Sequence, residues 1–576
     1  MPHSRISRSF RNCSSFNRGF CRIAAAAALA AALSCGRTGG GARRLAVFEI
    51  EDLSNASDGA WVKALVADAV VAQTAGSGGL MSFAVTDAND AARRRASHLL
   101  RGYLWRRANE WEFRGLLQEA GRGTESAIVA RAGSPLAVAR QAASRITGTP
   151  LPYTQNEAAA EWYARALAGA QDSAALLEKA ARLDPGFGRP ALLLARRKAA
   201  AGDRDGALAA LRPMLEPSGT ANPVVRLQGE ALRAALEGDA GAQFAAAERL
   251  ADLLPHDAEM LAQFGGMVAR KGDFARAAEY YRRALAAEPD VPALWNETAY
   301  VQSFAGDLNG ALKSLAEYDR VSGKSPNAAD SLGEIQFAHG NFREARRAFL
   351  DAYDRGPSFL GSYTLRKAGL SAYFAGDRAA AAADFERYAD AVARNPVLEL
   401  SRAQWAYLTA SREQALRLIT AACAQRNLAL ACAQQAVWIA AAGGDGRPVA
   451  ARAQALARNP IEARWAALAS FVSQPDEGAA GWERRAGGNH PALIYALLMH
   501  RHFAAAIPVL EAQIARTRAL ESGEWRYLLG WAKLETGARS EAAGLLARLP
   551  FPRSSPDAQF EFLVFATADA LRNRPR

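Results

Sequence analysis

The sequence lacks the short motifs that mark the common catalytic and cofactor sites. It has no HExxH zinc-binding pair, no GxSxG nucleophile turn, no GxxxxGK[ST] phosphate loop, and no GxGxxG after a strand. Histidine is scarce, with seven residues among 576. His500 and His502 stand two apart, which on a helix would point their side chains in different directions. We therefore expect no enzyme activity, no cofactor and no metal ion.

Cysteine is also scarce, and none of the five residues belongs to a CxxC pair of the kind that builds a zinc ribbon. On one continuous helix, Cys423 and Cys432 would lie about 13 Å apart and could not bond. A turn near residues 425–427 would instead place them on facing helices, where an oxidising compartment would permit a disulfide. The sequence leaves two alternatives for Cys423 and Cys432: a disulfide, or two buried thiols.

The apolar run near the N-terminus, residues 23–34, is too short to span a bilayer, which takes about 20 helical residues. It follows a basic stretch and ends at a cysteine, so residues 1–34 resemble a bacterial lipoprotein signal. The resemblance implies cleavage before Cys35 and acylation of that residue, although Leu33 replaces the small residue that is usual there. The alternatives are ordinary signal cleavage and an alanine-rich cytoplasmic helix. Residues 35–43 are Gly-rich and basic, which predicts a flexible tether.

Acidic residues are fewer than basic ones, giving a formal net charge of +12. This mild excess does not by itself indicate nucleic acid, and no nucleic-acid partner is expected. It suits the anionic surface of a membrane. We therefore expect the chain to be lipid-anchored at the bacterial cell envelope and to face the periplasm. If residues 1–34 are not a lipoprotein signal, the alternatives are a soluble periplasmic protein and a cytoplasmic one.

Residues 44–150 are predicted to form a small α/β module of order β-α-β-α-β-β-β-α. The expected strands are 45–50, 81–86, 98–106, 110–118 and 125–131, and the expected helices are 59–74, 88–97 and 134–146. The segments LAVFEIEDLSNAS, LLRGYLWRR, EWEFRGLLQEA and SPLAVARQAASRI make this module resemble the TolB-amino-terminal-like family. The resemblance implies a non-catalytic module that precedes repeat arrays in bacterial regulators and envelope proteins.

Glycines followed by Asp or Asn recur at a nearly fixed interval along the middle of the chain. They are Gly202, Gly238, Gly272, Gly306, Gly340 and Gly376, at spacings of 36, 34, 34, 34 and 36 residues. A period near 34 is typical of a solenoid of helix pairs. One pair cannot bury its own apolar face, so neighbouring pairs stack and share a continuous core. Each glycine is expected to form the left-handed turn between two helices.

The unit at residues 258–291 carries small Gly265, Ala277 and Ala284, with Tyr281 between repeats and Pro289 at the end. This pattern resembles the tetratricopeptide (TPR) repeat. The predicted fold class is therefore mainly α, a TPR-like α-solenoid of helix hairpins preceded by the α/β module. The array is predicted over 153–396. Residues 397–576 are predicted to be degenerate helical repeats, with a TPR-like unit near 523–554 and a C-terminal cap helix.

In TPR arrays the first helix of each pair lines a concave groove, so the register gives the side chains expected there. They are Asn296, Tyr300, Phe304, Asp330, Glu334, Phe337, Arg366, Tyr373 and Phe374. Aromatic and Arg side chains dominate binding hot spots, so we expect a segment of another protein as ligand. The alternative is that these rings pack against neighbouring helices. The Lys and Asn residues of the family's carboxylate clamp are not reproduced, so a C-terminal carboxylate ligand is not expected.

Two functions remain as hypotheses. The first is a non-enzymatic scaffold that binds protein partners through the groove and the membrane through its lipid. The second is a sensory or regulatory protein in which the α/β module binds a ligand and the array relays that event to a partner.

Overall fold

The computed structural model describes residues 43–552, 565, 568 and 571, apart from 55, 57, 75–79, 122, 149, 217–221, 489 and 518–521. The predicted signal, Cys35 and nearly all of the tether lie outside the described residues. The described chain divides into two compact units, one running to Phe264 and including Arg282–Asp290, the other comprising Gly265–Tyr281 and Val291 onward. No helix in the described part is both long and apolar enough to cross a membrane.

The first unit opens with a sheet in the order β3-β1-β4-β5-β6, with β2 paired to β4. Its strands are β1 (Arg43–Val47), β2 (Glu51–Asp52), β3 (Leu80–Ala84), β4 (His98–Arg107), β5 (Glu110–Glu119) and β6 (Glu125–Ala132). Strand β1 runs parallel to β3 and β4, whereas β4, β5 and β6 form an antiparallel meander. The order of strands and helices is the predicted one, with the two-residue β2 in addition.

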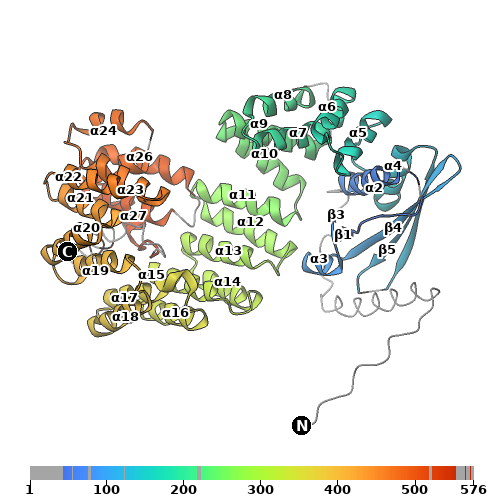
Figure 1. The fold of residues 1–576 in the computed structure, drawn as a ribbon. Coiled ribbons are helices and arrows are strands. Elements are labelled where there is room, and N and C mark those ends of the chain that lie inside the picture. The colour runs from blue at the N-terminus through green and yellow to red at the C-terminus, as the bar shows by residue number, and fades with distance from the viewer. Residues whose placement is uncertain are drawn as a thin grey trace, which may run out of the picture. The chain divides into compact units, whose positions relative to one another are not determined.

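Two helices lie on one face of this sheet, and one short helix lies beside part of the other face (Figure 1). Strand residues alternate between the faces, so Leu45 and Val47 join a core with α2 (Gly59–Thr74) and α4 (Pro135–Thr147), whereas Ala46 joins a smaller core beside α3 (Ala88–Arg93). The predicted cap is present, because the Ser134 hydroxyl accepts the amide of Ala137 at the start of α4.

The rest of the first unit is built from helix pairs. They are α5 (Glu157–Leu167), α6 (Ser173–Leu183), the 3-10 turn η1 (Pro185–Phe187), α7 (Arg189–Ala200), α8 (Arg204–Leu215), α9 (Pro223–Glu237) and α10 (Ala240–Leu253). The segment Arg282–Asp290 also belongs to this unit. Two of its acids bind arginines of the α/β region: buried Arg44 contacts Glu288 at 2.6 Å, and Arg95 binds Asp290 through two nitrogens at 2.8 and 3.1 Å.

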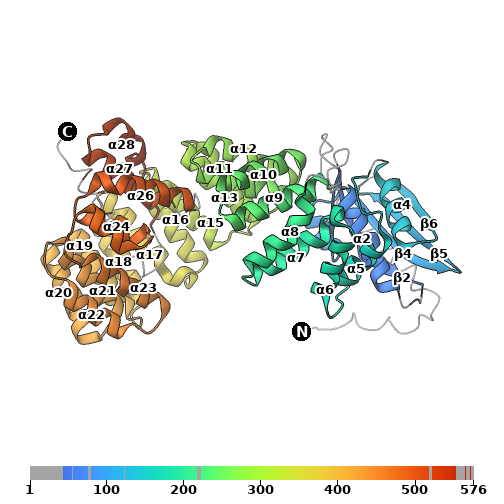
Figure 2. The same cartoon turned by 90° about the horizontal axis from the view of Figure 1, so that it is seen from above.

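The second unit is also built from helix pairs, and Figure 2 shows its helices α15, α16 and α17 side by side. The first helices of the unit are α11 (Ala258–Arg270), α12 (Phe274–Ala287), α13 (Pro292–Ala305), α14 (Leu308–Val321), α15 (Pro326–Ala338), α16 (Phe342–Arg355), the turn η2 (Phe359–Ser362), α17 (Tyr363–Phe374) and α18 (Arg378–Ala391). Both α11 and α12 contribute residues to each unit.

Helices also fill the region where the sequence period fades. They are α19 (Val397–Thr409), α20 (Arg412–Arg426), α21 (Ala429–Ala441), α22 (Arg447–Leu456), α23 (Pro460–Val472), α24 (Ala479–Ala486), α25 (His490–Met499), α26 (Phe503–Arg516), α27 (Gly523–Glu535) and α28 (Arg539–Leu546). The predicted fold class is therefore confirmed: a TPR-like array of helix hairpins follows a small α/β region.

The turn chemistry explains why the hairpins recur. All six periodic glycines have positive φ, between 79° and 92°, as a left-handed helix end requires. The following Asp begins the next helix, as where Asp307 accepts the amide of Gly310 at 2.8 Å. Asn341 is the exception, because its side chain makes no capping bond. Close helix contact needs a further glycine, since a Cβ on Gly333 would lie 2.5 Å from the ring of Phe349.

Candidate binding groove

The predicted groove residues lie on α13, α15 and α17, the first helices of three consecutive pairs. The register therefore places them on neighbouring helices, and contacts join several of them: Tyr300 with Glu334, Phe337 with Phe374, and Tyr373 with Phe374. Five are buried, namely Tyr300, Asp330, Phe337, Tyr373 and Phe374. The other four, Asn296, Phe304, Glu334 and Arg366, are half-buried. Their use by a partner stays a prediction, but none is fully exposed.

The chain itself covers this face at α13 and α15. After α28, the Arg548 Nη1 donates to the carbonyl of Phe304 at 2.5 Å, and the Leu549 amide donates to the carbonyl of Ala338 at 3.1 Å. The ring of Phe551 packs edge-on against Tyr300 and Phe304, with centroids 5.1 and 5.6 Å away. We call residues 548–551 the docking segment. Its contacts cross more than 200 positions of sequence, and no periodic pattern signals them.

Two further contacts cover the α17 end of the face. Phe565, near the C-terminus, lies against Phe337 and Phe374 at centroid distances of 5.6 and 5.9 Å. The Tyr373 hydroxyl donates to the carbonyl of Leu408 in α19 at 2.9 Å. Later parts of the same chain therefore contact at least five of the nine predicted groove residues: Tyr300, Phe304, Phe337, Tyr373 and Phe374.

Side chains of α13, α15 and α17 also form a buried ion cluster. The ammonium of Lys367, whose side chain is fully buried, donates to both carboxylate oxygens of Asp330 at 2.9 and 2.8 Å and to Glu334 at 2.7 Å. The Tyr300 hydroxyl donates to the second oxygen of Glu334 at 2.5 Å. The sequence analysis singled out Asp330, Glu334 and Tyr300 but missed Lys367. The sequence pattern that could have identified it is a lysine one position after Arg366, one repeat beyond the two acids.

Burial and mutual charge set the ionisation of this cluster. Burial raises the pKa of Asp330 to about 6, with Lys367 opposing the rise. Burial acts to lower the pKa of Lys367, but Glu334 and Asp330 outweigh it and the net pKa is raised. Burial and the neighbouring Glu334 raise the pKa of Tyr300. The lysine therefore stays charged at neutral pH and the tyrosine stays protonated, so the cluster is a closed structural network.

Two arginines have no such carboxylate partners among the described residues: Arg526, near the docking segment, and Arg548, which belongs to it. Arg526 of α27 lies over the ring of Phe274 at 4.7 Å, and that ring stacks on Phe304 at 5.1 Å. Burial lowers the pKa of Arg526 to about 10 and also lowers the pKa of Arg548. Neither arginine forms an ion pair with a carboxylate in the described part of the chain. Among the described residues, this corner of the unit therefore holds two partly desolvated cations with no carboxylate partner.

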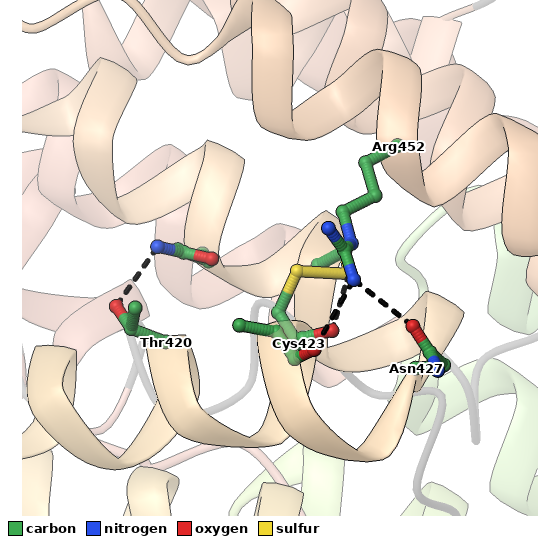
Figure 3. The surroundings of a disulfide bond; sticks show 7 residues. Thr420, Cys423, Asn427 and Arg452 are labelled. Atoms are coloured by element: carbon green, nitrogen blue, oxygen red, sulfur yellow. Dashed lines mark hydrogen bonds between the residues drawn. A yellow bond between two sulfur atoms is a disulfide. The ribbon is translucent and has the colours of Figure 1, made fainter.

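The structure joins Cys423 and Cys432 by a disulfide (Figure 3). Helix α20 ends at Arg426, and Asn427 adopts a left-handed conformation with φ of 52°, so α21 turns back beside α20. Arg452 steadies this turn by donating to Asn427 Oδ1 at 2.9 Å and to the carbonyl of Ala424 at 3.2 Å. This is the arrangement with a turn at 425–427, rather than one continuous helix.

Reducing this disulfide is expected to lower the free energy of unfolding by about 2–3 kcal/mol, the entropy of closing a loop of roughly ten residues. The measurement compares urea midpoints of oxidised and reduced protein by tryptophan fluorescence. A Cys423→Ala/Cys432→Ala variant serves as the control, because its midpoint should not respond to reductant. An equal response of both proteins to reductant would contradict a stabilising bond at this site.

In the first unit, a polar cluster links the α/β region to the first helix pairs. Asp68 of α2 accepts from Tyr153 at 2.9 Å, from Tyr163 at 3.2 Å and from Arg189 at 2.5 Å. Burial first, and then Asp68, raises the pKa of both tyrosines, so they remain hydroxyl donors. Beside it, a hollow of about 1060 Å³ is lined in part by Arg140 and Ser144 of α4 and by the ring of Phe187.

No group of three or more His, Cys, Asp or Glu side chains is placed to hold a metal ion within the described ranges.

Comparison with known proteins gives only distant likenesses. No family model and no curated protein matches the chain. A TPR protein from Parabacteroides merdae is 15% identical, with 41% of this chain and 91% of that chain covered and a TM-score of 0.32. YrrB, described as a TPR protein with an unusual peptide-binding site, is 16% identical, with 33% of this chain and 97% of that chain covered and a TM-score of 0.29. MamA from Desulfovibrio magneticus RS-1 is 18% identical, with 30% of this chain and 97% of that chain covered and a TM-score of 0.26. The helix pairs themselves, and not these likenesses, establish the fold.

Proposed function

We propose that this chain is a non-enzymatic scaffold that binds a segment of a partner protein through the face formed by α13, α15 and α17. The observation that supports it is the docking segment, which this face holds through helix-end carbonyls and aromatic rings. In one recurring mode of peptide recognition, main-chain hydrogen bonds supply affinity and pockets for side chains supply specificity.

A photo-crosslinking experiment in intact bacterial cells tests the scaffold function. Asp307 is exposed and follows Gly306 at the end of α13, so a photo-reactive amino acid there would report on molecules that approach this face. The control carries the same group at Leu416, which is exposed on α20. We expect protein adducts from position 307 that position 416 does not give. Identical adducts from both positions, or none from position 307, would contradict a protein-binding role for this face.

We also propose that the scaffold is anchored at the bacterial cell envelope by a lipid on Cys35, facing the periplasm. The support is the basic stretch, the short apolar run and the cysteine that follows it. The measurement is the intact mass of protein purified from bacterial membranes, beside a Cys35→Ala variant. A chain that begins at Cys35 with added acyl mass, lost in the variant, is the expected result. An unmodified full-length chain in the soluble fraction would refute the anchor.

A second candidate function is ligand sensing by the α/β region. The hollow beside α4 favours it, because Arg140, Gln141 and Ser144 supply polar groups around a space large enough for a small molecule. Native mass spectrometry of the purified protein would test this candidate. A co-purified small molecule that is lost in an Arg140→Ala variant would support sensing, whereas an identical unliganded mass for both proteins would count against it.

A further inference from the structure

We infer that the docking segment, Arg548–Phe551, is an intramolecular ligand of the groove, and that a partner binds by displacing it. The inference deepens the proposed function, because it states what occupies the groove before a partner arrives and what chemistry the partner must present. Four observations carry it: the helix-end hydrogen bonds, the aromatic contacts, the charge of the site and the position of the segment in the chain.

The hydrogen bonds use acceptors that the repeat leaves free. The last carbonyls of an α-helix have no partner within the helix, and a bound segment can satisfy them. Phe304 belongs to the last turn of α13 and Ala338 ends α15. The guanidinium of Arg548 takes the first carbonyl, and the amide of Leu549 takes the second. The segment thus spans the ends of two helices, α13 and α15, in consecutive repeats.

The aromatic contacts fix the register of the segment. Phe551 lies against Tyr300 and Phe304, two residues that the repeat register assigns to the groove. Pro550, between the amide donor Leu549 and this ring, has no amide hydrogen of its own and favours an extended backbone. The recognised pattern is an arginine, a residue that donates its amide, a proline and an aromatic residue.

The electrostatics favour exchange of this segment over permanent closure. Arg548 is partly buried, and burial lowers the pKa of its guanidinium, yet it meets a carbonyl and no carboxylate within the described residues. A buried charge without a counter-ion is costly, so the segment loses part of what its contacts contribute. The Lys367 cluster nearby shows the contrast, since every charge there is paired. A partner segment that brings a carboxylate next to its own cation would remove that cost.

The position of the segment determines its competitive strength. It follows directly after α28, so the chain holds it near the groove at an effective concentration on the order of millimolar. A free peptide of the same sequence, binding with a dissociation constant of roughly 0.1 mM, would therefore bind about tenfold more weakly to wild type than to a protein with an empty groove.

The test measures binding of a fluorescein-labelled peptide of residues 546–553 (LARLPFPR) to the full-length protein by anisotropy. We compare wild type with the Arg548→Ala/Phe551→Ala variant. The expected result is roughly tenfold tighter binding to the variant, and no binding of a control peptide that carries the same two alanines. Equal affinity of both proteins for the peptide, or no binding to the folded variant, would overturn the inference.

Two further measurements keep the outcome clear. If the double variant fails to fold, as judged by far-UV circular dichroism, the single Phe551→Ala variant takes its place, with a smaller gain in affinity expected. Light scattering shows whether the segment acts within one chain. A wild-type dimer that is lost in the variant would assign the segment to a second copy and overturn the intramolecular arrangement. Crosslinking from position 307 reports on the scaffold function separately, because it requires a partner but no competition by this segment.

Discussion

Replacing Lys367 with methionine is expected to lower the free energy of unfolding by about 3–5 kcal/mol, because it leaves two buried carboxylates without their cation. Methionine keeps most of the volume of the side chain, so the loss reports on charge and not on a cavity. Urea unfolding followed by tryptophan fluorescence measures it, and faster hydrogen exchange in α15 and α17 would place the loss at the cluster. A loss below about 1 kcal/mol would show that Asp330 and Glu334 do not depend on Lys367.

The companion variant Lys367→Met/Asp330→Asn/Glu334→Gln separates pairing from packing. It removes all three charges while keeping similar shapes, so most of the lost stability should return.

The pH dependence of unfolding gives a second check on the single variant Lys367→Met. The pKa of Asp330 in the fold, about 6, is raised above its ordinary value of 3.8, so the folded state takes up this proton first as pH falls. Stability from this group therefore rises as the pH falls from 7 to about 5. Because Lys367 opposes the rise in pKa, its removal should raise the pKa of Asp330 further, so the loss in the single variant should shrink over that interval.

Replacing Phe337 with alanine is expected to cost about 3–5 kcal/mol, the loss typical of a large ring removed from a packed core. The repeat register assigns Phe337 to the groove, but its side chain is fully buried and touches Phe342, Phe374 and Phe565. An exposed groove residue would lose little stability on truncation and would lose partner binding instead. The urea midpoint of Phe337→Ala decides between these roles.

Phe304 provides the matched control for Phe337. It has the same side chain and the same predicted face, but it is only half-buried and contacts Phe274 and Phe551. Phe304→Ala should therefore cost less than half as much as Phe337→Ala. Equal losses for the two variants would mean that burial does not distinguish them and that the face is packed uniformly.

The sequence predicts the hairpins well because their turns depend on local chemistry. A glycine ends one helix in the left-handed conformation, and an Asp caps the next, so two adjacent residues such as Gly306 and Asp307 mark each turn. Beyond residue 397 the period fades because other turns replace this pair. Asn427 makes the left-handed turn between α20 and α21, and the short link at 410–411 joins α19 to α20.

The candidate site was predictable only in part, for a reason of distance along the chain. Repeat register identifies which side chains share a face, and the contact between Tyr300 and Glu334 agrees with it. Register says nothing about what lies on that face, because Phe551 comes more than 200 residues later and belongs to no repeat position. Lys367 was missed for a related reason: its partners are on another helix, and one helix viewed alone gives no sign of them.

The order in which the chain is synthesised has a consequence for the groove. Helix α17 ends at Phe374, and Arg548 follows 548 − 374 = 174 residues later. At a translation rate of about 5–20 residues per second, that stretch takes roughly 9–35 s to leave the ribosome. During this interval the nascent array carries the face of α13, α15 and α17 without the segment that later fills it. A chaperone or partner that reaches the chain at that stage meets no internal competitor, whereas one that arrives after synthesis does.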